Sequence, residues 1–227
     1  MVKVQQTFAS EPSLERCFSL LLGKDSEALE MLISLHAISN PRILDCTFGM
    51  GTMWKKCRFQ PTIKLDIRQL EGIVQDDFTT LSKISNESVD VVVFDPPHLP
   101  THAASGNSSK IWEERYGITN NGELRKGDNV TPLFKPFLAA AFRVLSNNGI
   151  VLAKISDLVH NHKYQWQQVA FVNACQESGF TACDLLIKSD PNAGNLMSSK
   201  WTGKPKHLRK AHCYWIVARK GKCEAPS

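Results

Sequence analysis

The sequence of 227 residues lacks any long apolar run and has no apolar stretch near its N-terminus. A membrane-spanning helix needs about 20 consecutive apolar residues, and no segment of this chain approaches that length. Residues Met1–Gln6 do not have the apolar core of a secretory signal. We therefore expect neither a membrane anchor nor secretion, and we expect the protein to be cytoplasmic.

Cysteine is present, but its pattern is not that of a metal site or of a disulfide-rich protein. The seven cysteines are odd in number, and no two of them form a Cys-x-x-Cys pair. We therefore expect no bound metal and only reduced thiols, as in an intracellular protein. The chain also has no Gly-x-x-x-x-Gly-Lys-Ser/Thr motif, which argues against a site for the phosphates of a nucleoside triphosphate.

The length of the chain and its 42% apolar content fit one α/β domain with a single hydrophobic core. There is no internal repeat and no linker, so residues 1–227 should form one domain. Residues 1–41 should form an N-terminal helical segment. Its first helix is expected over Leu14–Leu22, and its second should be capped by Asp25 or Ser26.

The rest of the chain alternates between short apolar runs and helix-like segments. This alternation predicts a Rossmann-like fold, in which a mostly parallel sheet has helices on both faces. No helix separates the last two strands, which should therefore form a hairpin-like antiparallel pair. Strands are expected at 42–47, 62–66, 72–78, 89–94, 149–155, 181–188 and 212–219. Helices are expected directly after residue 52 and at 81–85, 132–145 and 165–178, with a turn at 147–149.

The first candidate site is a glycine turn that follows the strand 42–47. Asp45 lies at the end of this strand, and Gly49-Met50-Gly51 comes directly after it. Glycines at a strand-to-helix turn let a ligand approach the backbone closely and expose N–H groups at the start of a helix. The pattern predicts the first βα unit of a nucleotide-binding fold.

Acidic residues also end the next two expected strands. Asp66 has the position that holds ribose hydroxyls in dinucleotide folds, although it lies 15 residues after Gly51 instead of about 20. An Asp at this point can equally cap the next helix, and the sequence favours neither alternative. Asp76, Asp77 and Phe78 follow, and a carboxylate beside an aromatic ring suits the edge and the face of an adenine ring.

The strand 89–94 is expected to be buried on both faces because it is β-branched and apolar, and it stops at Asp95-Pro96-Pro97-His98. The two prolines make a stiff turn at the carboxyl edge of the sheet, where open α/β sheets bind ligands. The Asp95 carboxylate and the Pro96 carbonyl can accept the N–H bonds of a nucleobase amine, and His98 can stack on the base. The alternative is an ordinary Pro-Pro turn with a solvated Asp, because a short motif is only a hypothesis.

Positive charge is concentrated near the C-terminus. Ser198–Lys222 holds 8 of the 27 basic residues and no acidic residue, which leaves 19 basic against 22 acidic residues elsewhere. A basic stripe on a faintly acidic body is typical of a nucleic-acid-binding protein, although a solvated basic tail has the same composition. The candidate nucleic-acid contacts in this stretch are Lys200, Lys204, Lys206, Arg209 and Lys210.

Two polar segments, 101–131 and 189–211, are expected to be loops that face the substrate. The first contains Trp112, Arg115 and Tyr116, and aromatic residues beside basic ones can stack on bases and contact phosphates. Trp112 is explained more simply by a short helix that packs on the body of the domain. Tyr116 is therefore the aromatic candidate for nucleic-acid binding.

These features together resemble the class I S-adenosylmethionine-dependent methyltransferases, and more narrowly the enzymes that methylate N6 of adenine or N4 of cytosine. The cofactor motif of that family, Asp-Pro-Phe-x-Gly-x-Gly-Thr, corresponds to Asp45-Cys46-Thr47-Phe48-Gly49-Met50-Gly51-Thr52. Its catalytic motif, Asp/Asn/Ser-Pro-Pro followed by an aromatic residue, corresponds to Asp95-Pro96-Pro97-His98. The resemblance implies a seven-stranded sheet with an antiparallel last strand, and S-adenosyl-L-methionine as the cofactor.

The resemblance also implies roles for single residues. It assigns Asp45, Gly49 and Gly51 to the methionine moiety of the cofactor, with Thr47 and Phe48 in the same motif. It assigns Asp66 to the ribose and Asp77 with Phe78 to the adenine, with Asp76 as the alternative to Asp77. Asp95, Pro96, Pro97 and His98 are the implied catalytic residues.

The implied reaction is methylation of an exocyclic amino group, adenine N6 or cytosine N4, in DNA. The chain has no room for the separate target-recognition domain that DNA-modifying members usually carry, so RNA remains an alternative, with adenine N6 or guanine N2 as the target. A non-catalytic nucleic-acid-binding partner with a methyltransferase fold is the remaining alternative.

Overall fold

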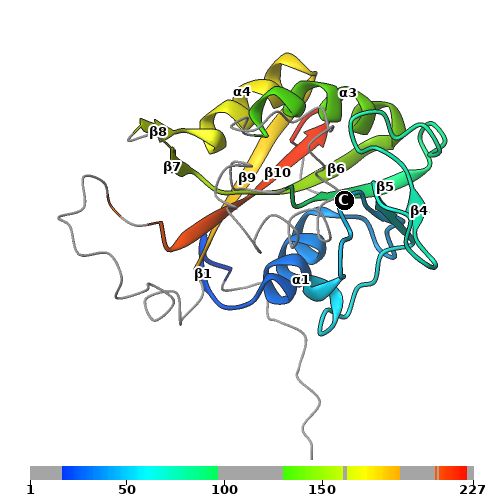
Figure 1. The fold of residues 1–227 in the computed structure, drawn as a ribbon. Helices are drawn as coiled ribbons and strands as arrows, with labels where there is room; N and C mark the ends of the chain where they lie inside the picture. Colours follow the sequence, from blue (N-terminus) through cyan, green and yellow to red (C-terminus); the bar gives the residue numbers. More distant parts are fainter. Residues whose placement is uncertain (1–16, 97–129, 161–162, 190–207, 209, 224–227) are drawn as a thin grey trace, which may run out of the picture.

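The computed structural model describes residues 17–96, 130–160, 163–189, 208 and 210–223 (Figure 1). In this part of the chain eight strands form one sheet in the order β1-β9-β10-β6-β5-β2-β3-β4, and β7 pairs with β8 in a separate hairpin. The strands are β1 (Leu20–Leu22), β2 (Ile43–Asp45), β3 (Ile63–Asp66), β4 (Val74–Gln75), β5 (Val89–Phe94), β6 (Leu145–Ile155), β7 (Leu158–His160), β8 (Lys163–Gln165), β9 (Phe180–Ser189) and β10 (His212–Lys220). The helices are α1 (Asp25–His36), α3 (Phe134–Val144) and α4 (Gln167–Glu177), with short 3-10 helices η2 (Thr52–Trp54) and η4 (Thr131–Leu133).

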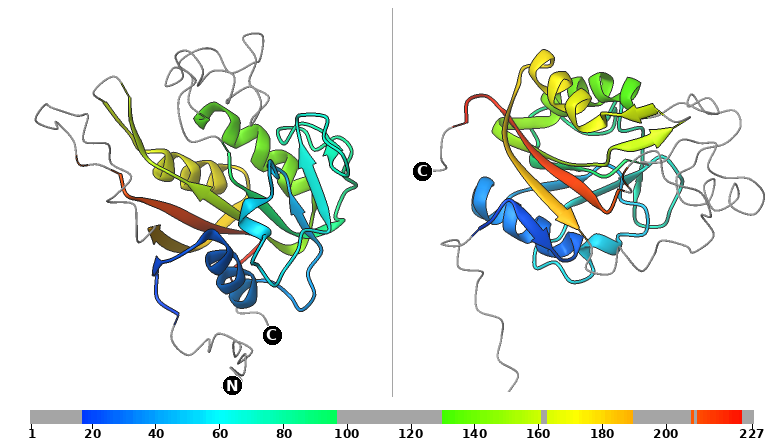
Figure 2. Two further views of the ribbon diagram at one scale, coloured as in Figure 1. Left: turned by 60° about the horizontal axis from the view of Figure 1, so that its bottom comes forward. Right: turned by 90° about the vertical axis from the view of Figure 1, so that its left-hand side faces the viewer.

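The predicted architecture is confirmed. Strands β6, β5, β2, β3 and β4 pair in parallel, whereas β10 is antiparallel to both of its neighbours, β6 and β9. Helices α3 and α4 cover one face of the sheet, and α1 lies on the other (Figure 2). Seven strands correspond to the predicted sheet, and β1 is an eighth strand that the sequence did not predict.

Strand β1 corrects the prediction of a helix over Leu14–Leu22. Its three residues pair in parallel with β9, the edge strand of the predicted sheet. The Ile187 N–H donates to the Ser19 carbonyl at 2.8 Å, and the Gly23 N–H donates to the Ser189 carbonyl at 3.1 Å. Three successive leucines fit a helix pattern, but the open backbone groups of β9 offer this segment hydrogen bonds that a short isolated helix would not gain.

Four further local predictions are wrong. The glycine turn is followed by the single turn η2 and not by a full helix, and residues 81–85 form turns in which Leu81 has a positive φ of 47°. The expected turn at 147–149 lies within β6. Helix α1 begins after Lys24 without a side-chain cap, so neither Asp25 nor Ser26 caps it. All of these predictions rest on short sequence patterns, and contacts with the rest of the fold decide the local structure instead.

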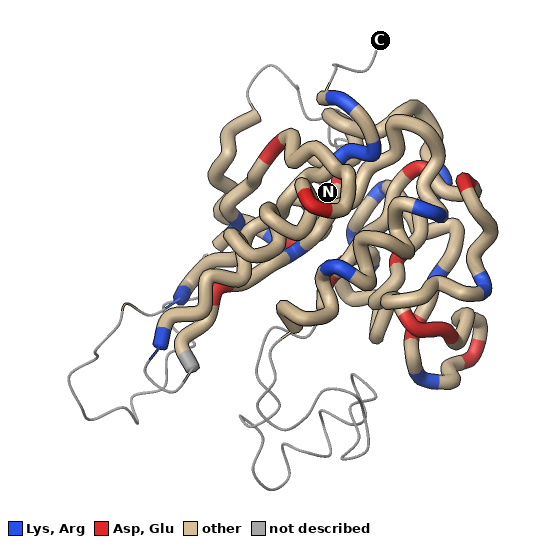
Figure 3. The backbone as a smooth tube through the Cα atoms, turned by 90° about the horizontal axis from the view of Figure 1, so that it is seen from above, with Lys and Arg blue, Asp and Glu red and all other residues tan. Residues whose placement is uncertain are grey.

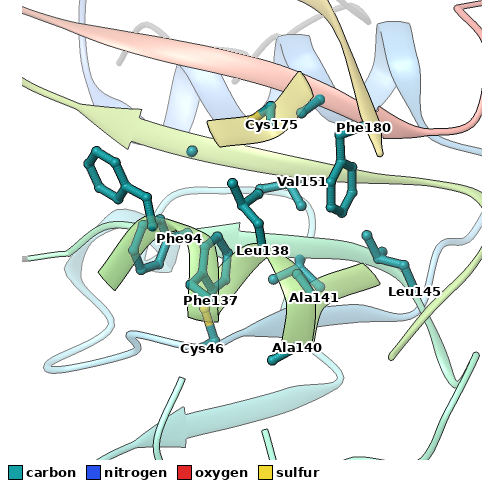
Figure 4. Packing of buried hydrophobic residues seen from close by; sticks show 14 of the residues in the cluster. Cys46, Phe94, Phe137, Leu138, Ala140, Ala141, Leu145, Val151, Cys175 and Phe180 are labelled. Atoms are coloured by element: carbon teal, nitrogen blue, oxygen red, sulfur yellow. The ribbon is translucent and has the colours of Figure 1, made fainter. Parts of the chain in front are cut away.

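The core has two layers, one on each face of the sheet. Between the sheet and helices α3 and α4, the Phe94 and Phe137 rings stack with centroids 3.8 Å apart, beside Leu138 and Val151 (Figure 4). On the other face, α1 packs against a cluster that includes Trp215. All six residues of β5 are buried, as predicted for a strand covered on both faces. This burial fixes the position of the turn that follows β5.

The cysteines correct one further expectation. Cys183 and Cys223 are joined by a disulfide that links β9 to the chain just beyond β10, with a Cα–Cα distance of 5.7 Å. The prediction of reduced thiols is therefore wrong for this pair. Within the described ranges, no group of three or more His, Cys, Asp or Glu residues could hold a metal ion, and no helix is long and apolar enough to cross a membrane.

Candidate functional site

The two motifs, which begin at Asp45 and Asp95, meet at the carboxyl edge of the sheet. Asp45 at the end of β2 is in register with Val93 of β5, so the turns that follow these strands lie side by side. The backbone N–H of Asp95 donates to the Thr47 side-chain Oγ1 at 2.8 Å, and the Cys46 thiol donates to the Val93 carbonyl at 3.1 Å. Cys46 and Thr47 replace the usual Pro-Phe of the family motif, and both hold the glycine turn to β5.

Asp45 lies beneath the glycine turn and is fully buried. Its Oδ1 accepts the Thr47 backbone N–H at 2.9 Å, and its Oδ2 accepts the Trp54 indole N–H at 2.6 Å. Burial raises the pKa of Asp45 to about 7, although these hydrogen bonds lower it. Asp45 therefore supports the turn from within the protein. Trp54 was not predicted as a site residue. The available signal was that a buried indole N–H needs a hydrogen-bond acceptor.

The raised pKa of Asp45 predicts a pH dependence of folding stability. Its pKa is about 7 in the folded protein and about 3.9 in an unfolded chain, so between these values the folded state holds the extra proton. Stability from this group is therefore present below about pH 4 and falls by up to about 1.4 kcal/mol per pH unit as the pH rises to about 7. In Asp45→Asn this contribution is absent. Urea unfolding between about pH 5 and pH 8 should show the free energy of unfolding of the wild type declining relative to that of the variant. Parallel curves for the two proteins would contradict the raised pKa.

The glycine turn has the geometry that a close backbone approach requires. Gly49 and Gly51 have φ values of 55° and 61°, in the left-handed region that favours glycine. A Cβ atom added at Gly51 would lie 2.5 Å from the ring of Phe48, so no larger residue fits there. Phe48 itself is covered on one side by Lys64, whose Nζ lies 5.2 Å from the ring centroid.

Asp66 connects β3 to the same turn. Its Oδ2 accepts the Gly49 N–H at 3.0 Å, and both of its oxygens accept N–H groups of the Arg68 guanidinium at 2.8 Å. Burial raises the pKa of Asp66, but the hydrogen bonds from Arg68 and Gly49 together outweigh it, so the pKa is lowered and the carboxylate is ionised. The residues between β3 and β4 form bends and turns and not a helix, so the helix-cap alternative is wrong. A ribose at this position would share Asp66 with Arg68.

The two acids after β4 have different surroundings. The Asp76 carboxylate is buried and accepts the Ser82 hydroxyl at 2.9 Å and the Lys83 N–H at 2.8 Å. The Asp77 Oδ1 accepts the N–H and the hydroxyl of Thr79, and Asp77 is only half-buried. The carboxylate of Asp76 thus holds its own loop together, which favours Asp77 over Asp76 as a ligand.

Phe78 lies between this loop and the core. Its ring packs edge-on against Phe94 with centroids 5.2 Å apart, and against Phe137 at 6.2 Å. The side chain is only half-buried, so part of the ring is exposed beside Asp77. The aromatic core thus fixes the position of Phe78 at the edge of the sheet.

A network of charged residues surrounds the catalytic-motif Asp95. Lys154 of β6 places its Nζ 3.2 Å from Asp95 Oδ2 and 3.0 Å from Asp25 Oδ2, and Lys188 lies 3.3 Å from Asp25 Oδ1. Burial lowers the pKa of Lys154, but Asp95 and Asp25 outweigh burial and raise it, so this lysine stays cationic. Neither Lys154 nor Asp25 was predicted as a site residue. The available signal for Lys154 was its position inside an apolar strand, because a buried lysine is rare unless it is paired with an acid.

Many predicted site residues lie outside the described part of the chain. They are Pro97, His98, Tyr116, Lys200, Lys204, Lys206 and Arg209, together with most of the loops 101–131 and 189–211. Pro96 is described and buried, and Lys210 is described next to Tyr164. Basic and acidic positions are interspersed over the described backbone, so local geometry must identify any binding surface (Figure 3).

The sheet order, the glycine turn after β2 and the carboxylate turn after β5 define the fold of class I S-adenosylmethionine-dependent methyltransferases. No protein-family model and no curated protein sequence matches the chain. Among solved structures, it is similar to a candidate methyltransferase from Bacillus halodurans, with 14% identity and a TM-score of 0.52 over 88% of this chain and 100% of that one. At 14% identity, this similarity shows that the two proteins share a fold and nothing more.

Two other solved structures are similar to this chain. A candidate methyltransferase from Haloferax volcanii, solved with the methyltransferase activator Trm112, has 14% identity and a TM-score of 0.50 over 87% of this chain and 90% of that one. A candidate DNA modification methylase from Thermus thermophilus has 15% identity and a TM-score of 0.42 over 73% of this chain. This chain spans only 57% of the length of the Thermus protein.

Proposed function

We propose that this protein is an S-adenosyl-L-methionine-dependent methyltransferase that methylates an exocyclic amino group of a nucleobase, adenine N6 or cytosine N4, in DNA. The observation that carries the proposal is the hydrogen bond from the Asp95 N–H to Thr47 Oγ1. It fixes Asp95, the first residue of the Asp-Pro-Pro motif, directly beside the glycine turn, so a bound cofactor and a bound base would lie next to each other. Holding two reactants in this way is a large source of catalytic rate.

The residues around the glycine turn fit the cofactor. Gly49 leaves open the space that a Cβ atom would occupy, where a ligand can contact the backbone, and Gly51 lets the Phe48 ring pack closely against the turn. Asp66 is an ionised acceptor for ribose hydroxyls, and Asp77 with the exposed part of Phe78 suits an adenine. When bound, S-adenosyl-L-methionine would supply a methyl group activated by its sulfonium. Asp45 would maintain the turn from beneath.

Asp95 would act on the amine of the target base. The lone pair of an exocyclic amine is delocalised into the ring, which makes the nitrogen a weak nucleophile. The Asp95 carboxylate and the Pro96 carbonyl would accept its two N–H bonds and favour the pyramidal nitrogen that attacks the methyl group. Lys154, fixed by its ion pair with Asp25, would hold the carboxylate of Asp95 in place.

This reaction needs no nucleophilic side chain on the enzyme. The described cysteines of the site agree with this, because burial raises the pKa of Cys46 and raises that of Cys213 to about 11. Their thiols therefore remain protonated at neutral pH. The attacking nitrogen would lose a proton after it gains the methyl group, and the Asp95 carboxylate, as its hydrogen-bond acceptor, would accept that proton and pass it to solvent.

The test is methyl transfer from S-adenosyl-L-methionine labelled in its methyl group to duplex DNA, single-stranded DNA and total RNA, followed by nucleoside analysis. Label in N6-methyladenine or N4-methylcytosine of DNA is the expected result, and Asp95→Ala serves as the inactive control. Label only in RNA, on adenine N6 or guanine N2, would retain the chemistry and correct the substrate. Bound cofactor without transfer to any of these acceptors would favour a non-catalytic nucleic-acid-binding partner.

A further inference from the structure

An aromatic and basic surface lies at the same edge of the sheet as Asp95. It is formed by the β7–β8 hairpin, the start of α4 and the start of β10 (Figure 1). The strand register gives its position. Tyr214 of β10 pairs with Ile155, the last residue of β6, and the preceding residue of β6 is Lys154, which contacts Asp95. This surface therefore begins next to the proposed catalytic turn.

Trp166 is an exposed aromatic residue of this surface. It lies between β8 and α4, and 62% of its accessible area is exposed. Its ring centroid is 4.2 Å from that of Tyr164, so one side of the indole is supported by another aromatic ring. Exposed aromatic faces of this kind stack on nucleobases without requiring a particular sequence, because every base has a π-face.

Positive charge accompanies the rings. The Lys210 Nζ lies 3.9 Å from the centroid of the Tyr164 ring and donates a hydrogen bond to its hydroxyl. Lys163 is exposed on β8 in the same hairpin. The acid in this cluster is Asp157, which is only 4% exposed and accepts the Tyr164 hydroxyl at 2.9 Å. The outer side of the cluster is therefore cationic, as contacts to phosphates require.

The surface is also held rigidly before any ligand binds. Besides the Tyr164 hydroxyl, Asp157 accepts the Gln168 N–H at 2.9 Å, and in this way it caps helix α4, which has no cap from its own N-terminal residue. Burial raises the pKa of Tyr164 to about 12, so its hydroxyl stays protonated and keeps its bond to Asp157. A preorganised surface loses less entropy when it binds a ligand.

We propose that Trp166, Tyr164 and Lys210 form a stacking platform that binds single-stranded nucleic acid beside the base to be methylated. Trp166 stacks on a flanking base, and Lys210 contacts the backbone phosphate. This inference rests on the proposed function, because it assigns the platform to the strand that delivers the target base. The platform would hold an opened strand, which the reaction needs because a base in a duplex must leave the stack to be reached.

The experiment is fluorescence anisotropy of a fluorescein-labelled, mixed-sequence single-stranded DNA of about 20 nucleotides, titrated with the full chain. Trp166→Ala should weaken binding roughly 10- to 100-fold, and Trp166→Phe should stay within about 3-fold of the wild type. Lys210→Gln should weaken binding a few-fold and reduce the salt slope by about one. The matched controls are Ile38→Ala and Lys222→Gln, exposed residues beyond the far ends of α1 and β10, which should bind as the wild type does.

Binding of Trp166→Ala that equals that of the wild type would overturn the platform. If circular dichroism shows that this variant is unfolded, quenching of tryptophan fluorescence by unlabelled DNA decides the question. The platform requires the quenching to be smaller in Trp166→Phe than in the wild type, and equal quenching would overturn it.

The methyl-transfer assay keeps this inference separate from the proposed function. Binding that depends on Trp166 without any methyl transfer would refute the proposed function and leave the platform intact. Transfer by Trp166→Ala with an unchanged KM for single-stranded DNA would refute the platform and leave the proposed function intact.

Discussion

Replacing Asp95 by Ala is expected to reduce methyl transfer by roughly 10³-fold or more, while the affinity for S-adenosyl-L-methionine stays within a few-fold of the wild type. Removal of one well-placed hydrogen-bonding group from an active site typically costs 10²- to 10³-fold in rate. Here the lost carboxylate would also have oriented the nucleophilic nitrogen. The cofactor site should be intact, because the Asp95 contact to Thr47 is made by the backbone N–H, which Ala retains.

The controls for this experiment come from the same ion network. Asp95→Asn keeps one acceptor oxygen and should lose less activity than Asp95→Ala, in keeping with the Asn-Pro-Pro form of the family motif. Asp25→Asn removes the negative charge of the second partner of Lys154 without changing Asp95. Kinetics give the rate, and isothermal titration calorimetry gives the cofactor affinity. Equal loss of transfer and of cofactor binding in Asp95→Ala would show that the residue is structural.

Replacing Gly51 by Ala is the second change with a large expected effect. The new Cβ would lie 2.5 Å from the Phe48 ring, and the backbone has a φ of 61°, which costs an Ala residue about 1–2 kcal/mol. Either the turn or Phe48 must move, and both belong to the proposed cofactor site. We expect the affinity for S-adenosyl-L-methionine to fall at least about 10-fold, as measured by calorimetry.

Gly72→Ala is the matched control. Gly72 has a φ of 69°, but a Cβ atom there would have no neighbour within 4 Å. Thermal unfolding should show a similar backbone strain in both variants, whereas only Gly51→Ala should lose cofactor affinity. A comparable loss of affinity in both variants would mean that general destabilisation, and not the shape of the turn, explains the result.

Strong local patterns predicted the central part of the fold. The buried β5 and the Asp-Pro-Pro stop could be identified from sequence, because a β-branched run that ends in prolines has few alternatives. Strand β1 could not be predicted, because its three leucines become a strand only when the edge of β9 is present to pair with them. The helix expected after Gly51 was equally ambiguous, since a glycine turn predicts a helix start and not its length.

Some residues of the candidate site could be predicted from the sequence, and others could not. Asp45, Asp66 and Asp95 lie at strand ends, and their meeting at one edge follows from the parallel pairing of β2, β3 and β5. Lys154 and Asp25 are 129 residues apart in the sequence, and only the folded chain brings them together. The same holds for Trp166 and Lys210, which belong to segments whose proximity depends on the antiparallel β10.

Cys46 donates a hydrogen bond to β5, and Thr47 accepts one from Asp95. Replacing these two residues by the Pro-Phe pair that is usual in the motif is therefore expected to weaken the site. Introducing Pro-Phe at these positions would bring the motif closer to that of the methyltransferases that the sequence resembles. It would also remove the thiol that donates to Val93 and the hydroxyl that accepts the Asp95 N–H. The two motifs are therefore constrained as a pair, so a residue at position 47 can be exchanged freely only together with a new partner for position 95.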